Sequence, residues 1–88
     1  MKYEKRPEIV DVFMWSRAED WDDLPPWLAE IKYQTNKDIW TNSRGSLCIE
    51  INGTVTYVVA TGMYIVNHGD KFEVISPMEL HKKYKKVE

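Results

Sequence analysis

Residues 46–60 read SLCIEINGTVTYVVA, and this stretch decides the fold class. Apolar and polar residues alternate over 47–51, and the alternation continues over 55–59 with Val55 on the side that faces the core. A period of two is typical of a strand with one buried face. The Asn-Gly pair at 52–53 accepts the two positive φ angles of a type I′ turn. The stretch therefore predicts a β-hairpin.

Further strands are expected on both sides of this hairpin. Downstream, residues 63–67 and 71–75 are strand-like, and the His-Gly-Asp sequence at 68–70 between them supplies turn residues. Upstream, residues 9–15 are apolar except for one aspartate and predict a first strand that starts after Pro7 and buries a tryptophan at its end. Residues 38–41 predict one more short strand. Because the strands from 46 to 75 are short and consecutive, antiparallel neighbours in a meander are expected.

Two short helices are also expected. The sequence DLPP at 23–26 provides a start for a helix over 25–33, because proline suits the first turn and the acidic side chain of Asp23 can cap free amides. The sequence SPME at 76–79 combines a serine N-cap, proline at the first helical position and glutamate three residues after the serine. This capping box predicts a C-terminal helix that ends near residue 84.

The length and composition agree with one domain over residues 1–88. With 43% hydrophobic, 12% aromatic and 30% charged residues, the composition is that of an ordinary globular chain. The predicted fold is α+β, a small antiparallel β-sheet meander with one helix packed on a face and a short C-terminal helix. No segment reaches the roughly 18 to 20 apolar residues that a membrane span needs, so no membrane association is expected.

The single cysteine, Cys48, cannot form an internal disulfide, which favours a reducing compartment and predicts a cytoplasmic location. Cys48 lies in the middle of a predicted strand with no nearby activating base, so a packed structural thiol is expected. His68 and His81 are too far from Cys48 and from each other in sequence to form a metal motif. The sequence thus predicts no cofactor, no metal and no enzymatic activity.

An acidic, aromatic stretch is the first candidate surface. It consists of Asp20, Trp21, Asp22, Asp23 and Trp27. Carboxylates steer a basic partner toward a surface and tryptophan often anchors protein interfaces, so these residues are candidates for protein docking. The alternative is a solvated loop whose Trp21 folds back onto the core. Solvent exposure of Trp21 distinguishes the two, because a docking anchor must be accessible.

A basic C-terminal end is the second candidate surface. It consists of Lys82, Lys83, Lys85 and Lys86, which are candidate phosphate-binding residues. Lysines at a helix C-terminus also interact favourably with the negative end of the helix dipole, which explains their position without a ligand. The net charge is −2, with −4 over residues 1–70 and +2 over residues 71–88. A chain of this balance is unlike a general nucleic-acid binder, so nucleic acid remains the alternative partner and a protein the leading one.

Short motifs occur at both ends of the chain. They are MKY at 1–3, KRP at 5–7, IVDV at 9–12 and Trp15, and then Gly62, YIV at 64–66, Phe72, Pro77 and Tyr84. Together they resemble a family of small phage and prophage proteins. That family opens with Met-Lys-Tyr, two basic residues and proline, and ends with a Gly-Asp-Tyr-Ile-Ile hairpin, a proline-started helix and a tyrosine.

The resemblance covers the two ends and none of the middle, with several departures. Met63 stands where the family has aspartate, the turn at 68–70 is one residue shorter, Leu80 replaces an aromatic residue, and Ile75-Ser76 replaces a cysteine-lysine pair. The resemblance implies a phage-encoded cytoplasmic accessory protein of no assigned activity, with no catalytic residues to carry over. The leading hypothesis is a small non-enzymatic protein that binds a host or phage protein, of open oligomeric state.

Overall fold

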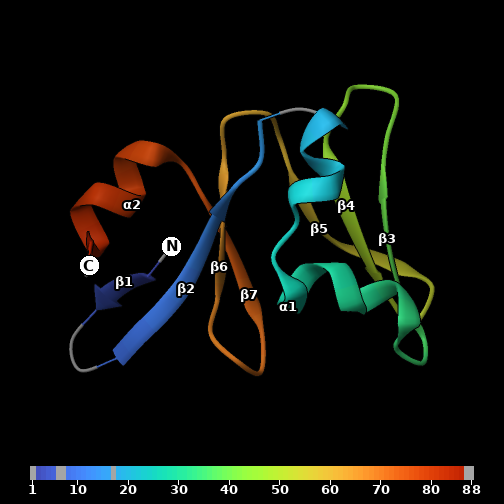
Figure 1. The fold of residues 1–88 in the computed structure, drawn as a ribbon, viewed down its shortest axis with the longest axis horizontal. Helices are drawn as coiled ribbons and strands as arrows, with labels where there is room; N and C mark the ends of the chain where they lie inside the picture. Colours follow the sequence, from blue (N-terminus) through green and yellow to red (C-terminus); the bar gives the residue numbers. More distant parts are fainter. Residues whose placement is uncertain (1, 6–7, 17, 87–88) are drawn as a thin grey trace.

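The computed structural model describes residues 2–5, 8–16 and 18–86. Within these residues eight strands form two antiparallel sheets with short helices beside them (Figure 1), which confirms the expected α+β class. The strands are β1 (Lys2–Lys5), β2 (Glu8–Met14), β3 (Lys37–Thr41), β4 (Leu47–Ile51), β5 (Thr54–Val59), β6 (Tyr64–Asn67), β7 (Phe72–Ile75) and β8 (Lys85–Lys86). The helices are α1 (Pro26–Ala29) and α2 (Pro77–Lys83), and the 3₁₀ segments are η1 (Ala18–Asp23) and η2 (Glu30–Tyr33).

The larger sheet has the strand order β7-β6-β2-β1-β8 and supplies side chains to two separate cores. Successive residues of a strand point to opposite faces. Accordingly, Val12 and Val66 belong to one buried cluster, whereas Phe13 and Ile65 belong to or pack against the other. Val10 and Val12 are buried and Phe13 is partly buried, whereas Ile9 and Met14 at the ends of β2 are exposed, so its apolar run contributes to both cores only in its middle.

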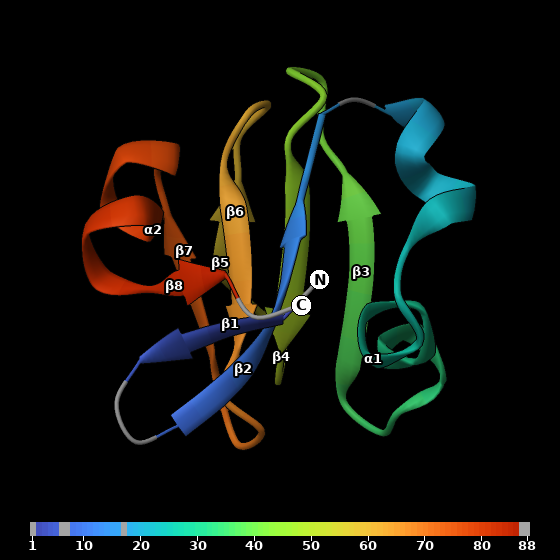
Figure 2. The ribbon, with the colours of Figure 1, turned by 60° about the vertical axis from the view of Figure 1, so that its left-hand side comes forward.

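Helix α2 covers the outer face of this sheet, away from the three-stranded sheet (Figure 2). The Ser76 hydroxyl accepts a hydrogen bond from the Glu79 amide at 3.2 Å, and the Glu79 carboxylate accepts one from the Ser76 amide at 3.5 Å. The predicted capping box is therefore confirmed. Leu80 and Tyr84 are buried on the sheet, as their spacing of four residues requires.

The smaller sheet has the strand order β3-β4-β5, and its core side is covered by α1, η1 and η2. Asn52 and Gly53 have φ values of 53° and 81°, which confirms the predicted turn between β4 and β5. Trp15 is fully buried in the main core, as predicted for the end of the first strand. Its indole Nε1–H donates to the Gly45 carbonyl at 2.8 Å and thereby ties β2 to the turn before β4.

A β-bulge corrects one detail of the predicted hairpin. Glu50 pairs with Val55, but Ile49 pairs with Tyr57, so Thr56 is the extra residue on β5. Because of this extra residue, the side chains of β5 between the bulge and the turn point to the face opposite to the one that strict alternation predicts. Val55, expected to face the core with Val59, is instead 42% exposed.

The connection after β5 corrects the predicted meander. Among the described residues β5 pairs only with β4, whereas β6 pairs with β2 and β7, so the chain changes sheets at residues 60–63. Gly62 has a φ of 88°, and its N–H donates to the Trp15 carbonyl at 2.7 Å. β2 thereby occupies the edge of β6 that a meander would assign to β5. The sequence pattern predicts neither β1 nor β8.

The predicted helix over 25–33 consists of two pieces, α1 and η2. Pro25 is the N-cap of α1, with no side-chain cap, so the expected capping role of Asp23 is wrong. A second proline follows directly and begins the helix with a fixed φ, which makes a side-chain cap unnecessary for starting the turn. Leu28 and Ile31 are buried as expected.

Candidate functional site

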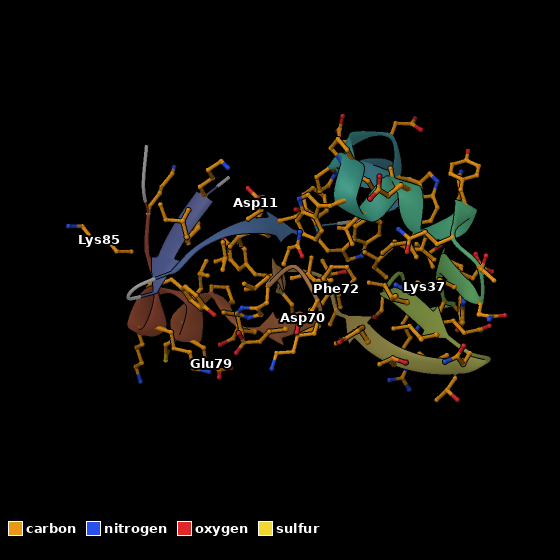
Figure 3. The ribbon with its side chains drawn as sticks, turned by 90° about the horizontal axis from the view of Figure 1, so that it is seen from below. Asp11, Lys37, Asp70, Phe72, Glu79 and Lys85 are labelled. Carbon is orange, nitrogen blue, oxygen red and sulfur yellow. The ribbon has the colours of Figure 1, made fainter. Side chains whose placement is uncertain are left out.

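Two sheet edges meet along a groove. β5 is an outer strand of the smaller sheet and β7 an outer strand of the larger one, and the two lie close together without pairing. The groove between them has a volume of about 730 Å³ and is lined by residues 56–58, His68 and residues 70–74. Figure 3 shows Phe72 and Asp70 in the region where the two sheets meet. A groove of this size is in the range that proteins use to hold ligands.

Aromatic side chains form one wall of the groove. The rings of Tyr57 and Phe72 pack edge to face with centroids 5.6 Å apart, and Trp27 of α1 packs against Phe72 at 5.7 Å. The Phe72 amide donates a hydrogen bond to the Tyr57 hydroxyl at 3.2 Å. Tyr57 thus joins the two sheets through both its ring and its hydroxyl. These contacts give the groove a rigid apolar wall.

The backbone of β7 presents hydrogen-bonding groups to the groove. The His68 amide donates to the Lys71 carbonyl at 2.9 Å, which makes these two residues a hydrogen-bonded pair of the hairpin. In an antiparallel ladder, hydrogen-bonded pairs alternate with pairs whose backbone groups point away. The backbone groups of Phe72 and Val74 therefore point away from β6, and the bond from Phe72 to Tyr57 agrees with this.

A charged cluster lies at the α2 side of β7. The Glu73 Oε1 atom accepts hydrogen bonds from His68 Nε2 and from the Tyr84 hydroxyl, both at 2.9 Å. Lys83 Nζ lies 3.2 Å from Glu73 Oε2. His68 comes from the end of β6, whereas Tyr84 and Lys83 come from the end of α2. One carboxylate therefore joins the second hairpin to the C-terminal helix.

The cluster keeps Glu73 ionised. Burial alone would raise the pKa of Glu73, but the hydrogen bonds from His68, Tyr84 and Lys83 outweigh burial and lower this pKa from 4.5 to about 2. Each carboxylate oxygen can accept about two hydrogen bonds. Oε1 is occupied by two donors, and Oε2 faces Lys83. Oε2 therefore retains the capacity to accept a second donor.

The other sheet edges of the described residues are obstructed. β3 packs against η2, and β8 carries Lys85 and Lys86, which are charges of the kind that protect an edge. β5 carries the bulge at Thr56, which interrupts its edge. β7 has neither a bulge nor a lysine along its four residues. Its edge faces β5, and the Tyr57 hydroxyl occupies the outward amide of Phe72 there.

The candidate docking residues of the acidic stretch are separated in the structure. Trp21 is half-buried and packs against the main core, so the exposure that a docking anchor requires is not found there. The alternative, in which Trp21 folds back onto the core, is confirmed, although the segment is a 3₁₀ helix rather than a loop. Asp22 and Asp23 are exposed, and the side chain of Asp20 lies outside the described residues. Trp27 instead supports the groove through Phe72.

The candidate phosphate-binding lysines lie on two elements, with Lys82 and Lys83 on α2 and Lys85 and Lys86 on β8. Lys83 pairs with Glu73, and Lys86 is engaged as well. Lys82 and Lys85 are exposed. The structure therefore does not assemble the four side chains into one uncommitted cationic patch.

Cys48 is buried, as expected of a structural thiol, and burial raises the pKa of its thiol. In the described part of the chain, no group of three or more His, Cys, Asp or Glu side chains is arranged to hold a metal ion. Among the same residues, no helix is both long and apolar enough to cross a membrane.

The sequence pattern predicts neither the groove nor the Glu73 cluster. The pattern predicts a turn at His68 and a strand at Glu73, but the contact between them depends on the register of the β6–β7 hairpin. A histidine just before a two-residue turn and a glutamate three residues after that turn lie on the same face of a hairpin, and this spacing is the sequence signal that predicts their contact. The adjacency of β5 and β7 has no comparable local signal.

No protein-family model matches the chain, and no curated protein or solved structure is significantly similar to it. The geometry of the groove and its edges is therefore the basis for functional inference.

Proposed function

We propose that this chain is a small non-enzymatic accessory protein, encoded by a phage or prophage, that binds a protein partner along the groove between β5 and β7. The observation that carries the proposal is the juxtaposition of two unpaired strand edges beside an aromatic wall. Unpaired strand edges are templates for another polypeptide. Aromatic side chains are enriched at the centres of protein interfaces.

The charge of the groove favours a protein over a nucleic acid. Its lining carries two carboxylates, Asp70 and Glu73, against one lysine, Lys71. A nucleic acid would bring phosphates to these carboxylates, which is electrostatically unfavourable. A polypeptide brings backbone amides and a choice of side chains, and these suit a mixed surface of this kind.

The phage origin rests on the resemblance of the two ends, and the cytoplasmic location on the use of a single cysteine. Several of the motif residues have clear structural roles in this chain. Pro77 starts α2, Tyr84 joins the Glu73 cluster, and Phe72 forms part of the aromatic wall.

Site-specific photo-crosslinking tests the proposal. Val58 lines the groove and is 50% exposed, so a benzoylphenylalanine at this position samples the proposed interface. Met78 on α2 is 68% exposed and does not line the groove, which makes it the matched control. In host cells, we expect a defined protein adduct from position 58 and none of the same mass from position 78.

Two results would contradict the proposal. Equal adducts from both positions would indicate non-specific contact. A nucleic-acid adduct, together with binding that weakens steeply with salt, would instead support the basic C-terminal surface.

A further inference from the structure

The smaller sheet has an outer face, opposite the side that α1, η1 and η2 cover, and this face carries apolar side chains. Residues paired across neighbouring strands share a face. One row on the outer face consists of Trp40, Cys48 and Val58, and the next row consists of Asp38, Glu50 and Val55. Within the described residues, none of the four apolar side chains belongs to either buried core. These six residues form the outer patch.

The β-bulge at Thr56 helps to build the outer patch. Val55 and Val58 are three residues apart and would face opposite sides of a regular strand. The extra residue places both valines on the outer face, where they are 42% and 50% exposed. Cys48 lies between Val58 and Trp40 in its row and is buried. A row of apolar side chains thus crosses all three strands, with exposed valines at its β5 end.

Two carboxylates face each other beside this row. Asp38 and Glu50 are directly opposed across β3 and β4, and like charges in such positions destabilise a sheet. Asp38 accepts a hydrogen bond from the Ile39 amide at 2.8 Å, but neither carboxylate has an ion pair among the residues that the structure describes. Lys37, next to Asp38 in sequence, pairs with Ile51 and therefore lies on the opposite face. The charge of the outer patch thus favours a cation from outside the chain.

We infer that the protein partner of the groove also covers the outer patch and places an arginine side chain against Trp40, Asp38 and Glu50. This inference rests on the proposed function, because Val58 belongs both to the groove lining and to the outer patch. A protein seated in the groove at Val58 thus lies at the border of the patch. The exposed valines offer it apolar contact area, and the two carboxylates offer it a charged contact.

Arginine matches the chemistry of the outer patch better than lysine does. Its planar guanidinium donates two parallel hydrogen bonds to a carboxylate and stacks on aromatic rings. Side chains two residues apart on one strand face are separated by about 7 Å, so one arginine can contact both the Trp40 ring and the Asp38 carboxylate. Its aliphatic stem packs on apolar surface such as that of the valines. Lysine carries the charge but lacks the planar group.

Charge argues against a symmetric dimer through the same patch. A two-fold interface uses the same surface on both copies. It would enclose Asp38 and Glu50 of each copy, whereas the described strand residues of this face include no lysine or arginine. Burial of charges without partners is unfavourable. A partner of different sequence supplies the cation that a second copy of this face lacks.

Peptides selected from a random decapeptide library provide the probe. The selection is run in parallel against the wild-type protein and against a variant with both Asp38→Asn and Glu50→Gln. We expect arginine to be roughly three times as frequent in the wild-type peptides as in those of the double variant. The tightest wild-type peptide is then labelled with fluorescein, and its affinity is measured by anisotropy. Replacing its arginine by citrulline, which has nearly the same shape but no charge, should weaken binding about tenfold.

The variant Val55→Lys tests the patch from the side of the protein. It places a positive charge directly opposite Glu50 and should weaken binding of the labelled peptide about tenfold. Thr54→Lys adds the same charge at the neighbouring exposed position, but on the face of Ile51, and is the matched control. We expect binding to this control to be weaker by less than about threefold. If Val55→Lys does not fold, the citrulline peptide against the wild-type protein decides the question.

Different results overturn this inference and the proposed function. Peptides without arginine enrichment, or equal binding to Val55→Lys and Thr54→Lys, would overturn the partner arginine and leave the groove as the binding site. The absence of a defined protein adduct from position 58 in host cells would overturn the proposed function itself. A dimer in sedimentation that Val55→Lys dissociates would show that a second copy covers the outer patch, and would also overturn the partner arginine.

Discussion

Glu73 is the residue through which strand β7 is tied to helix α2. Three side chains from two elements donate to its carboxylate. Such charge-assisted bonds are stronger than neutral ones. The position of Glu73 on the edge strand means that the same carboxylate contributes both to stability and to the charge of the groove.

The free energy of unfolding is therefore expected to vary with pH in the acid range because of Glu73. Because the pKa of Glu73 is lowered from 4.5 to about 2 in the folded state, the carboxylate stabilises the fold above pH 4.5. This contribution is lost as the pH falls from about 4.5 toward 2. Glu73→Gln should remove about 2 kcal/mol of this acid dependence, measured by urea denaturation across that range.

Glu30→Gln, a change at an exposed carboxylate of η2, is the control for this experiment and should retain the wild-type acid slope. The same slope in Glu73→Gln as in the wild type would show that the cluster does not stabilise the fold.

The turn at Gly53 offers a second test at the scale of one residue. No atom lies within 4 Å of the position that a Cβ would take, but the φ of 81° strains a β-branched side chain. Gly53→Val should lower stability by about 1 kcal/mol or more, a fall of roughly 4 to 8 °C in melting temperature. Thr54→Val, in the adjacent strand, should leave the melting temperature nearly unchanged. An unaltered Gly53→Val protein would contradict the turn.

Among the elements, α2 depends most on its ends. Its seven residues are too few for an isolated helix to be stable in water, so the capping box and the buried Leu80 must hold it. Ser76→Ala leaves the Glu79 amide without its acceptor. We expect a loss of about 0.5 to 2 kcal/mol in the free energy of unfolding, measured in urea. Met78→Ala, at an exposed position of the same helix, should cost less than about 0.5 kcal/mol.

Trp21 is the residue through which the segment η1 packs against the main core. Since this ring is half-buried against the main core, Trp21→Ala should cost about 1 to 3 kcal/mol, less than the 3 to 5 kcal/mol typical of a fully buried aromatic residue. Tyr33→Ala, at a ring that is 80% exposed, should change the unfolding free energy by less than about 0.5 kcal/mol. Thermal melts of the two variants measure the difference. A Trp21→Ala protein as stable as the wild type would return Trp21 to the candidate docking residues.

For the whole molecule, the sequence predicts the elements whose signals are local. The Asn-Gly turn at 52–53, the capping box at 76–79 and the apolar strand β2 all depend on neighbouring residues, and all three are found. β1 pairs with β2 over four residues and with β8 over two, and β8 pairs with β1. Their sequences, KYEK and KK, carry little apolar pattern, and the pairing of Tyr3 with Lys86 has no local signal.

The groove was unpredictable for a related reason. The groove exists because the chain leaves one sheet after β5 and joins the other at β6. β6 joins that sheet because it pairs with β2. Alternation identifies each strand but not its neighbour. The bulge at Thr56 also turns Val55 to the face opposite to that of Val59, although the alternation of residues 55–59 places them on the same face. The candidate site thus depends on long-range pairing, which hydrophobic periodicity does not encode.

The division into two sheets has a consequence for synthesis on the ribosome. The smaller sheet is formed by three strands consecutive along the chain, β3 to β5, so its contacts close short loops. The larger sheet needs β6 to pair with β2, and β8 to pair with β1, across most of the chain. β1 and β2 therefore emerge early and can pair with each other, but their apolar side chains stay exposed until β6 is translated. During that interval the nascent chain has the greatest need of a chaperone.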